Sequence, residues 1–220
     1  MQNGTWAGWV EVEGTRHLVE PARFQGTRDR SWGIRTVGAP DVQPNPAATG
    51  FQFFWIWAPM NFKDFSIHYF VNQDEHGAAW NENGVLVPKF GGGEEVTLHG
   101  LEYEQAYQSG TRHAREATIR MASKTDRYEI KLQPKWSFYM KGIGYGHASF
   151  RHGSYHGELD VLREQYVLRE VGPENLHIQA MCDIELTSSR GTERGQGVLE
   201  QLVIGPHAPS GFSEVMDFAP

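Results

Sequence analysis

The stretch FQFFWIWAPM (Phe51–Met60) is followed after one residue by FKDFSIHYFV (Phe62–Val71). Aromatic and β-branched residues dominate both runs, and such residues favour extended strands. Alternation along the first run places four aromatic side chains on one face, those of Phe51, Phe53, Trp55 and Trp57. The first run is too apolar to have a fully solvated face. The two runs therefore predict neighbouring strands in the core of a β protein.

Period-two alternation recurs along the rest of the 220 residues, with turn signals between the runs. The runs include residues 6–12, 17–20 and 24–35, and residues 158–171 are expected to pair with the strand that follows them. The segment 115–124 is read as a strand because β-branched residues and short length weaken a helix. No other segment has a convincing helical pattern. This spacing is typical of a β-sandwich or an up-and-down barrel.

The chain length fits one domain, residues 1–220, with a full hydrophobic core. The strongest break in the pattern is PKFGGGEE (residues 88–95), which contains three consecutive glycines. It is either a long hairpin loop or an internal domain boundary. An antiparallel barrel of this size can hold one small ligand.

Charge and cysteine content exclude several classes. The net charge is −7 and the arginines are scattered among acids, which argues against a nucleic-acid partner. The single cysteine, Cys182, cannot form an internal disulfide and is read as a small buried hydrophobe. The first residues lack the pattern of a signal peptide, and no window approaches the length of a membrane span. We expect a soluble cytoplasmic protein without a membrane span.

The stretch TRDRSWGIR (Thr27–Arg35) has no apolar face. Alternation places Thr27 and Asp29 on one side of this run and Arg28, Arg30 and Trp32 on the other. If the strand is internal its charges must be paired, because an unpaired buried charge costs several kcal/mol. The run is either a charged surface strand or the polar wall of a buried site.

Three segments together resemble a known family. GTRDRSWGIR (Gly26–Arg35) is similar to the Asp-[His/Arg]-x-Trp-Gly signature of the lipocalin-like carotenoid 1,2-hydratase (hydroxyneurosporene synthase) and AttH-type group. GIGYGHASFRHGSYHGEL (Gly142–Leu159) and GQGVLEQLVIGPH (Gly195–His207) resemble a bacterial branch of it whose motif reads RDHSWG. The resemblance implies an all-β, antiparallel lipocalin-like fold of two barrel halves, here with the first half incomplete. It also implies that Asp29 is a proton donor, while Thr27 replaces a tyrosine that is implicated in the family.

The aromatic strands supply further candidate site residues. His68 is either a satisfied core histidine or, if it faces a cavity with Asp29, the partner in an acid–base pair. Trp55 and Trp57 either pack in the core or form an aromatic wall that could stabilise a developing carbocation. The predicted substrate-binding set comprises Arg28, Arg30, Trp32, Trp55, Trp57 and Tyr69.

The glycine-rich segment HASFRHGSYHGE carries His147, His152, His156 and Glu158. These residue types suit zinc or iron, but the spacing matches no metal signature. Side chains at a pocket mouth, or structural hydrogen bonds, are the favoured interpretation. No metal and no cofactor are therefore predicted.

Two functions fit these observations. The first is binding of a hydrophobic small molecule, terpenoid or polyketide-like, in a barrel cavity, with cofactor-free hydration, isomerisation or cyclisation assisted by Asp29 and His68. The second is a non-catalytic binding protein of the same fold, in which Arg28, Asp29 and Arg30 form a structural ion network. An incomplete first barrel would expose an apolar face, and a homodimer could cover it.

Overall fold

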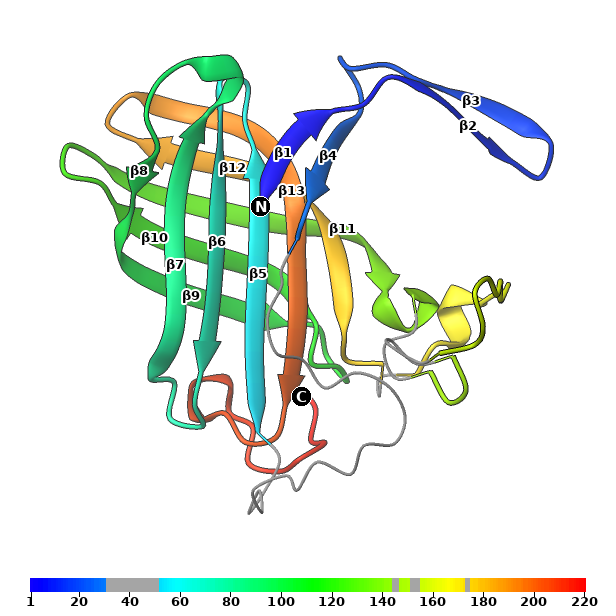
Figure 1. Cartoon of the computed structure of the whole chain (residues 1–220). Helices are drawn as coiled ribbons and strands as arrows, with labels where there is room; N and C mark the ends of the chain where they lie inside the picture. The colour runs from blue at the N-terminus through cyan, green and yellow to red at the C-terminus, as the bar shows by residue number, and fades with distance from the viewer. Residues whose placement is uncertain (31–51, 144–146, 151–154, 173–174) are drawn as a thin grey trace.

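The computed structural model (Figure 1) describes residues 1–30, 52–143, 147–150, 155–172 and 175–220. Strands make up most of the described chain, and its helical elements are short 3₁₀ turns. The all-β prediction is confirmed. Within these residues, no helix is long and apolar enough to cross a membrane. Trp32, one of the predicted site residues, lies outside the described residues, and so does His152.

Nine antiparallel strands form one strongly curved sheet, a nearly closed barrel. Their order across the sheet is β8-β7-β6-β5-β13-β12-β11-β10-β9. The strands are β5 (Phe53–Asn61), β6 (Phe65–Gln73), β7 (Ala79–Pro88), β8 (Val96–Thr97), β9 (His99–Tyr107), β10 (Ala114–Ala122), β11 (Arg127–Tyr139), β12 (Ile178–Ser188) and β13 (Gly191–Ile204). The Leu98 N–H, between β8 and β9, donates to the Gly84 carbonyl oxygen of β7 at 2.8 Å and helps to close the barrel. The antiparallel barrel prediction is confirmed.

The two aromatic runs form β5 and β6, which pair directly. Ala58 lies opposite Tyr69, and Trp57 lies opposite Phe70. Ile56, Ala58 and Tyr69 belong to the buried core inside the barrel. Alternation then places Trp57 and Phe70 on the outer face of the sheet.

Two glycines allow β13 to lie close to β5. A Cβ atom on Gly197 would stand 2.4 Å from the Pro59 carbonyl oxygen, and one on Gly195 would stand 2.4 Å from that of Asn61. Side chains do not fit at these distances. The glycines of GQGVLEQLVIGPH therefore have a packing role in the barrel.

The first 30 residues, here called the N-terminal arm, form two small sheets outside the barrel (Figure 1). β1 (Gln2–Thr5) pairs with β4 (Gln25–Arg28), and β2 (Gly8–Val12) pairs with β3 (Thr15–Val19). Glu13 and Gly14 both have positive φ, at 49° and 76°, as a two-residue type I′ hairpin turn requires. The turn lies between two of the predicted runs, residues 6–12 and 17–20.

The expected strand at residues 158–171 is wrong. This segment contains only the 3₁₀ turn η3 (Leu168–Glu170), and its side chains are mostly exposed. The physical reason is edge availability, since β12 is hydrogen-bonded to β11 on one side and to β13 on the other. No edge of β12 remains for a further strand.

The segment 88–95 carries the 3₁₀ turn η1 (Lys89–Gly91) and joins two paired strands, β7 and β8. The internal boundary expected there stays a prediction.

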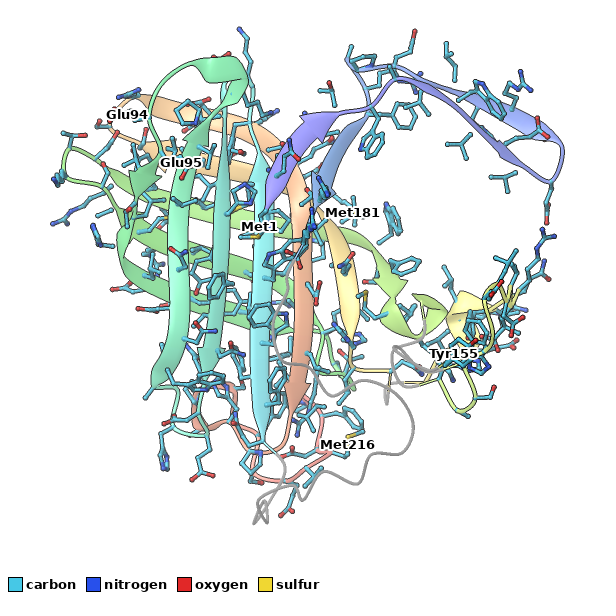
Figure 2. All side chains as sticks on the ribbon, viewed as in Figure 1. Met1, Glu94, Glu95, Tyr155, Met181 and Met216 are labelled. Carbon is cyan, nitrogen blue, oxygen red and sulfur yellow. The ribbon has the colours of Figure 1, made fainter. Side chains whose placement is uncertain are left out.

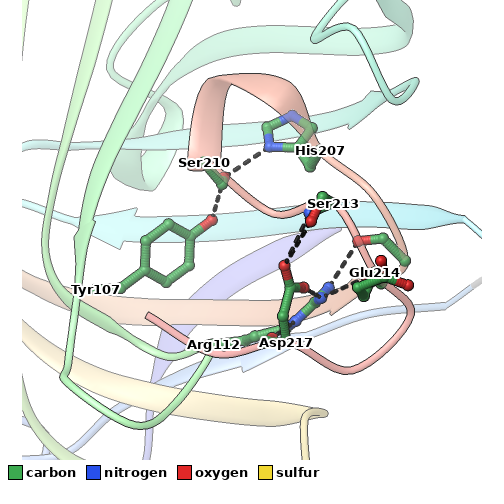
Figure 3. A network of polar contacts seen from close by, with 8 residues as sticks. Tyr107, Arg112, His207, Ser210, Ser213, Glu214 and Asp217 are labelled. Atoms are coloured by element: carbon green, nitrogen blue, oxygen red, sulfur yellow. Dashed lines mark hydrogen bonds and ion pairs between the residues drawn. The ribbon is translucent and has the colours of Figure 1, made fainter. Parts of the chain in front are cut away.

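The C-terminal segment lies across one end of the barrel, and Arg112 holds it there (Figure 3). The buried guanidinium donates to the carbonyl oxygens of Gly205 (2.7 Å), Glu214 (2.9 Å) and Asp217 (2.6 Å), and it also forms an ion pair with the Asp217 carboxylate. The η4 turn (Ala208–Ser210) is tied to the same end, where the Ser210 hydroxyl meets His207 Nδ1 at 2.6 Å.

Candidate functional site

A cleft of about 440 Å³ lies between the N-terminal arm and the outer face of the barrel. The arm contributes Phe24, Thr27 and Asp29 to its lining, and the barrel contributes Trp57, Gln179 and Met181, among others. The cleft therefore brings together Asp29 and Trp57, two residues that the sequence predicts to act on one ligand.

Strand register explains the barrel wall of this cleft. Trp57 of β5 lies opposite Glu200 of β13, and Glu200 lies opposite Gln179 of β12. Residues directly opposite each other in antiparallel strands project to the same face. Because Ile56 and Ala58 point into the core, this row of three side chains faces outward.

Glu200 is the centre of a polar network on this wall. Its carboxylate accepts from Trp55 Nε1 at 3.2 Å and from Gln179 Nε2 at 2.7 Å, and it meets His177 Nε2 at 2.9 Å. Burial by itself would raise the pKa of Glu200. The hydrogen bonds from His177, Gln179 and Trp55 outweigh burial, so its pKa lies below the ordinary value and the group is an anion at neutral pH.

His68 lies elsewhere on the outer face. It stands opposite Pro59 and is almost fully buried, and its Nδ1 has no hydrogen-bond partner among the described residues. Burial, and secondarily the N-terminal ammonium group of Met1, lowers the pKa of His68 to about 4. The imidazole is therefore neutral at pH 7. No hydrogen bond or ion pair among the described residues joins it to Asp29, and His68 does not line the cleft.

Met1 also touches the aromatic wall, since Trp57 Nε1 donates to its Sδ atom. Trp55 is on the same outer face and packs against Phe70 at 5.7 Å between ring centroids. Tyr69 lies on the opposite face, inside the barrel, where burial raises its pKa. The predicted substrate-binding set is thus divided between the two faces of one sheet.

The arginines flanking Asp29 are exposed. Arg28 ends β4, and Arg30 follows Asp29 immediately. Among the described residues, no ion pair involves Asp29. Asp29 is itself exposed at the cleft. The requirement that a buried charge be paired therefore does not apply to it.

The histidines expected at a pocket mouth have local partners. His147 Nδ1 accepts from the backbone N–H of Phe150 at 2.7 Å, so its proton is on Nε2, which donates to Glu164 at 3.1 Å. His156 stacks on Phe150, with ring centroids 4.5 Å apart, and lies 3.9 Å from Asp160. The described residues contain no group of three or more side chains that could hold a metal ion.

Cys182 faces the barrel interior. Burial, assisted by the charge of Asp183, raises the pKa of its thiol to about 12. A thiol with this pKa stays protonated and is a poor nucleophile at neutral pH. The interpretation of Cys182 as a small buried hydrophobe agrees with this placement.

Most of the chain matches one sequence family. A model described as "Family of unknown function (DUF8625)" matches residues 1–213. The chain belongs to this family. DUF8625 thus includes the N-terminal arm as well as the barrel, and with them both sides of the cleft.

Among curated proteins, none matches the chain. Among solved structures, one similar chain is the crystal structure of kievitone hydratase from Nectria haematococca, with 14% sequence identity and a TM-score of 0.46. The alignment covers 89% of this chain and 49% of the hydratase chain. This DUF8625 protein therefore spans about half the length of that structure.

Proposed function

We propose that this protein binds a hydrophobic small molecule, terpenoid or polyketide-like, in the cleft between the N-terminal arm and the outer face of the barrel. The observation that supports the proposal is the cleft itself, a cavity of about 440 Å³ whose lining includes Asp29 and Trp57. A cavity of this size is within the range of small-molecule sites, which combine apolar walls with a few polar groups.

The same arrangement suits acid-assisted, cofactor-free chemistry. As the general acid, the Asp29 carboxyl group would transfer a proton to an alkene carbon of the ligand. The cation formed on the neighbouring carbon would be stabilised by the face of Trp57. In a hydration, water adds to that cation and its extra proton returns to the Asp29 carboxylate. Loss of a different proton to the Asp29 carboxylate gives isomerisation. Attack on the cation by a second alkene of the ligand closes a ring and forms a new cation, and loss of a proton from this cation to the Asp29 carboxylate completes a cyclisation.

Gln179 links the cleft to the Glu200 network. Its amide lines the cleft and donates to Glu200, which His177 and Trp55 also contact. We assign these residues a positioning role, because they hold the polar wall in one orientation. His68 stays the predicted catalytic partner only if ligand binding brings it toward Asp29. Arg28, Arg30, Trp55 and Tyr69 stay candidate substrate-binding residues.

The barrel interior is the second candidate location for the ligand. Gln201 Nε2 and Gln105 Nε2 are buried there without a hydrogen-bond partner in the part of the chain that the structure describes, and the Tyr69 ring lies in the same interior. Buried amides of this kind are unusual unless a ligand or water satisfies them. Gln201→Leu would abolish binding if the ligand lies inside the barrel and leave it unchanged if the ligand lies in the outer cleft.

Asp29→Asn separates an enzyme from a non-catalytic binding protein. The variant is expected to keep its ligand and its fold, because Asp29 is exposed and makes no ion pair within the described chain. Turnover of the molecule that co-purifies with the protein, followed by chromatography and mass spectrometry, would fall by about 100-fold or more if Asp29 is the general acid. Equal turnover in the variant and the wild type would remove Asp29 from the chemistry.

A homodimer is the other partner in this proposal.

A further inference from the structure

An extended apolar surface remains open on one side of the molecule. Trp6 and Trp9 of the N-terminal arm are 60% and 57% exposed, and Trp136 on the outer face of β11 is 60% exposed. The residues that make up this surface, called the apolar face, are Trp6, Trp9, Leu18, Trp136, Phe138 and Met181. Figure 2 shows Met181 on the side of the barrel toward which the arm extends.

The hairpin of β2 and β3 cannot bury its side chains alone. Trp9 lies opposite Leu18 on one face of the hairpin, and Val10 and Val12 occupy the other face. Both faces are exposed to solvent. An isolated two-stranded hairpin is marginally stable in water unless it packs against further structure. The arm therefore requires a surface to cover it.

The sheet face beside the arm also carries exposed apolar side chains. Trp136 of β11 lies opposite Met181 of β12, so these two side chains share the outer face of the barrel. Phe138 lies two residues along β11 on that face. Adjacent exposed aromatic and thioether side chains are typical of interface centres rather than of ordinary protein surface.

We propose that a second copy of this chain covers the apolar face, with the N-terminal arm of each copy lying on the outer face of β11 and β12 of the other. At about 250 Å² for a whole tryptophan side chain, the three exposed tryptophans present on the order of 400 Å², about half of the roughly 800 Å² per partner of a standard stable interface. A two-fold dimer uses the same patch on both copies, so the arm and the sheet face are covered together.

The arm also has open backbone edges. Within the described chain, β2 and β3 pair only with each other, so each has one edge of free N–H and C=O groups. Such edges promote strand pairing with another chain. The β2–β3 hairpin lies outside the nine-stranded sheet and extends away from it (Figure 1).

The interface would also complete the ligand site. Phe24 and Met181 line the cleft, and both are exposed in the single chain. A second copy on this face would cover these two side chains and close that side of the cleft. The inference rests on the homodimer of the proposed function, but not on the identity or the presence of a ligand.

The test is the mass of the full chain in solution. Sedimentation equilibrium over a range of protein concentrations is expected to give twice the 24.9 kDa of one chain. Trp9→Ser and Trp136→Ser, made separately, are each expected to raise the dimer dissociation constant at least tenfold, as for aromatic residues near an interface centre. Trp80→Ser is the matched control, because Trp80 is an equally exposed tryptophan on β7, outside the apolar face.

Three results would overturn the inference. They are a wild-type chain that is monomeric at tens of micromolar, a dimer that both interface variants leave intact, and a dimer that Trp80→Ser weakens as much as they do. Circular dichroism on each variant verifies the fold, and a misfolded variant is replaced by Trp9→Gln or Trp136→Gln. Ligand binding is measured on the same samples, so a monomer that still binds its ligand would retain the proposed site and lose only the interface.

Discussion

Glu200→Ala is the perturbation whose effect follows most directly from the geometry of the site. The wild-type carboxylate contacts three side-chain nitrogens, those of Trp55, Gln179 and His177, at 2.7–3.2 Å, and it is only 14% exposed. Hydrogen bonds to a charged group contribute about 1.5–3 kcal/mol each, but they are not additive and water can reach an outer sheet face. We expect the free energy of unfolding to fall by roughly 2–4 kcal/mol.

Urea unfolding, followed by tryptophan fluorescence, measures this loss. Glu185→Ala is the control, because Glu185 is an exposed glutamate on neighbouring β12, and its loss is expected to change stability by less than about 0.5 kcal/mol. Equal losses in the two variants would show that the Glu200 contacts contribute nothing. A loss below about 0.5 kcal/mol for Glu200→Ala would lead to the same conclusion.

The pH dependence of the unfolding free energy provides a second test of the Glu200→Ala prediction. The folded pKa of Glu200 lies below its ordinary value of 4.5, so its stabilisation is complete above that value. It is lost as the pH falls through the folded pKa. The difference in stability between the wild type and Glu200→Ala should therefore narrow below about pH 4. A difference of the same size at pH 3 and pH 7 would refute the charge-dependent account.

Three further outcomes are expected from other parts of the molecule. Arg112→Leu should lower the free energy of unfolding, measured by urea titration, by about 3–5 kcal/mol. The reason is that it leaves the Asp217 carboxylate and three carbonyl groups without their donor. A loss under about 1 kcal/mol would contradict this expectation. Gly197→Ala should lower the thermal unfolding temperature by several degrees, since its Cβ would stand 2.4 Å from the Pro59 carbonyl oxygen. An unchanged temperature would show that the backbone of β5 can move away from the added methyl group without cost. Burial, with a contribution from Arg112 and against the opposing charge of Asp74, lowers the pKa of His207 to about 4, so its neutral form stabilises the fold above pH 6.5 and this stability is lost as the pH falls toward 4. His207→Gln should therefore flatten the curve of unfolding free energy against pH between these values. An unaltered curve would exclude this role.

The strands of the barrel core could be predicted because alternation reports burial directly. The run from Phe53 to Asn61 is apolar on both faces, and the structure covers both, with the core on one side and Met1 against Trp57 on the other. The segment 158–171 alternates nearly as well but forms no strand. Alternation describes a strand's faces, whereas pairing depends on free edges, and β12 has none.

The site could be predicted only in part, for a similar reason. The charged run around Asp29 indicated a polar wall, and Asp29 does line a cleft with Trp57. The sequence predicts both Tyr69 and Trp57 to bind substrate, although their side chains lie on opposite faces of the sheet. The Glu200 network was missed because its members come from β5, β13, β12 and the residue before β12, and only strand register brings them together. One signal was available, namely a glutamate and a glutamine within the otherwise apolar run GVLEQLVIG.

Native mass spectrometry of the protein purified from its own source tests the central claim most directly. The account predicts that the wild type carries a small hydrophobic molecule of a few hundred daltons, that Trp57→Ala loses it, and that Trp80→Ala, changed at an exposed tryptophan outside the cleft, retains it. A wild-type protein that carries no such molecule, or a Trp57→Ala variant that carries it as well as the control does, would contradict the claim that the outer cleft is the ligand site.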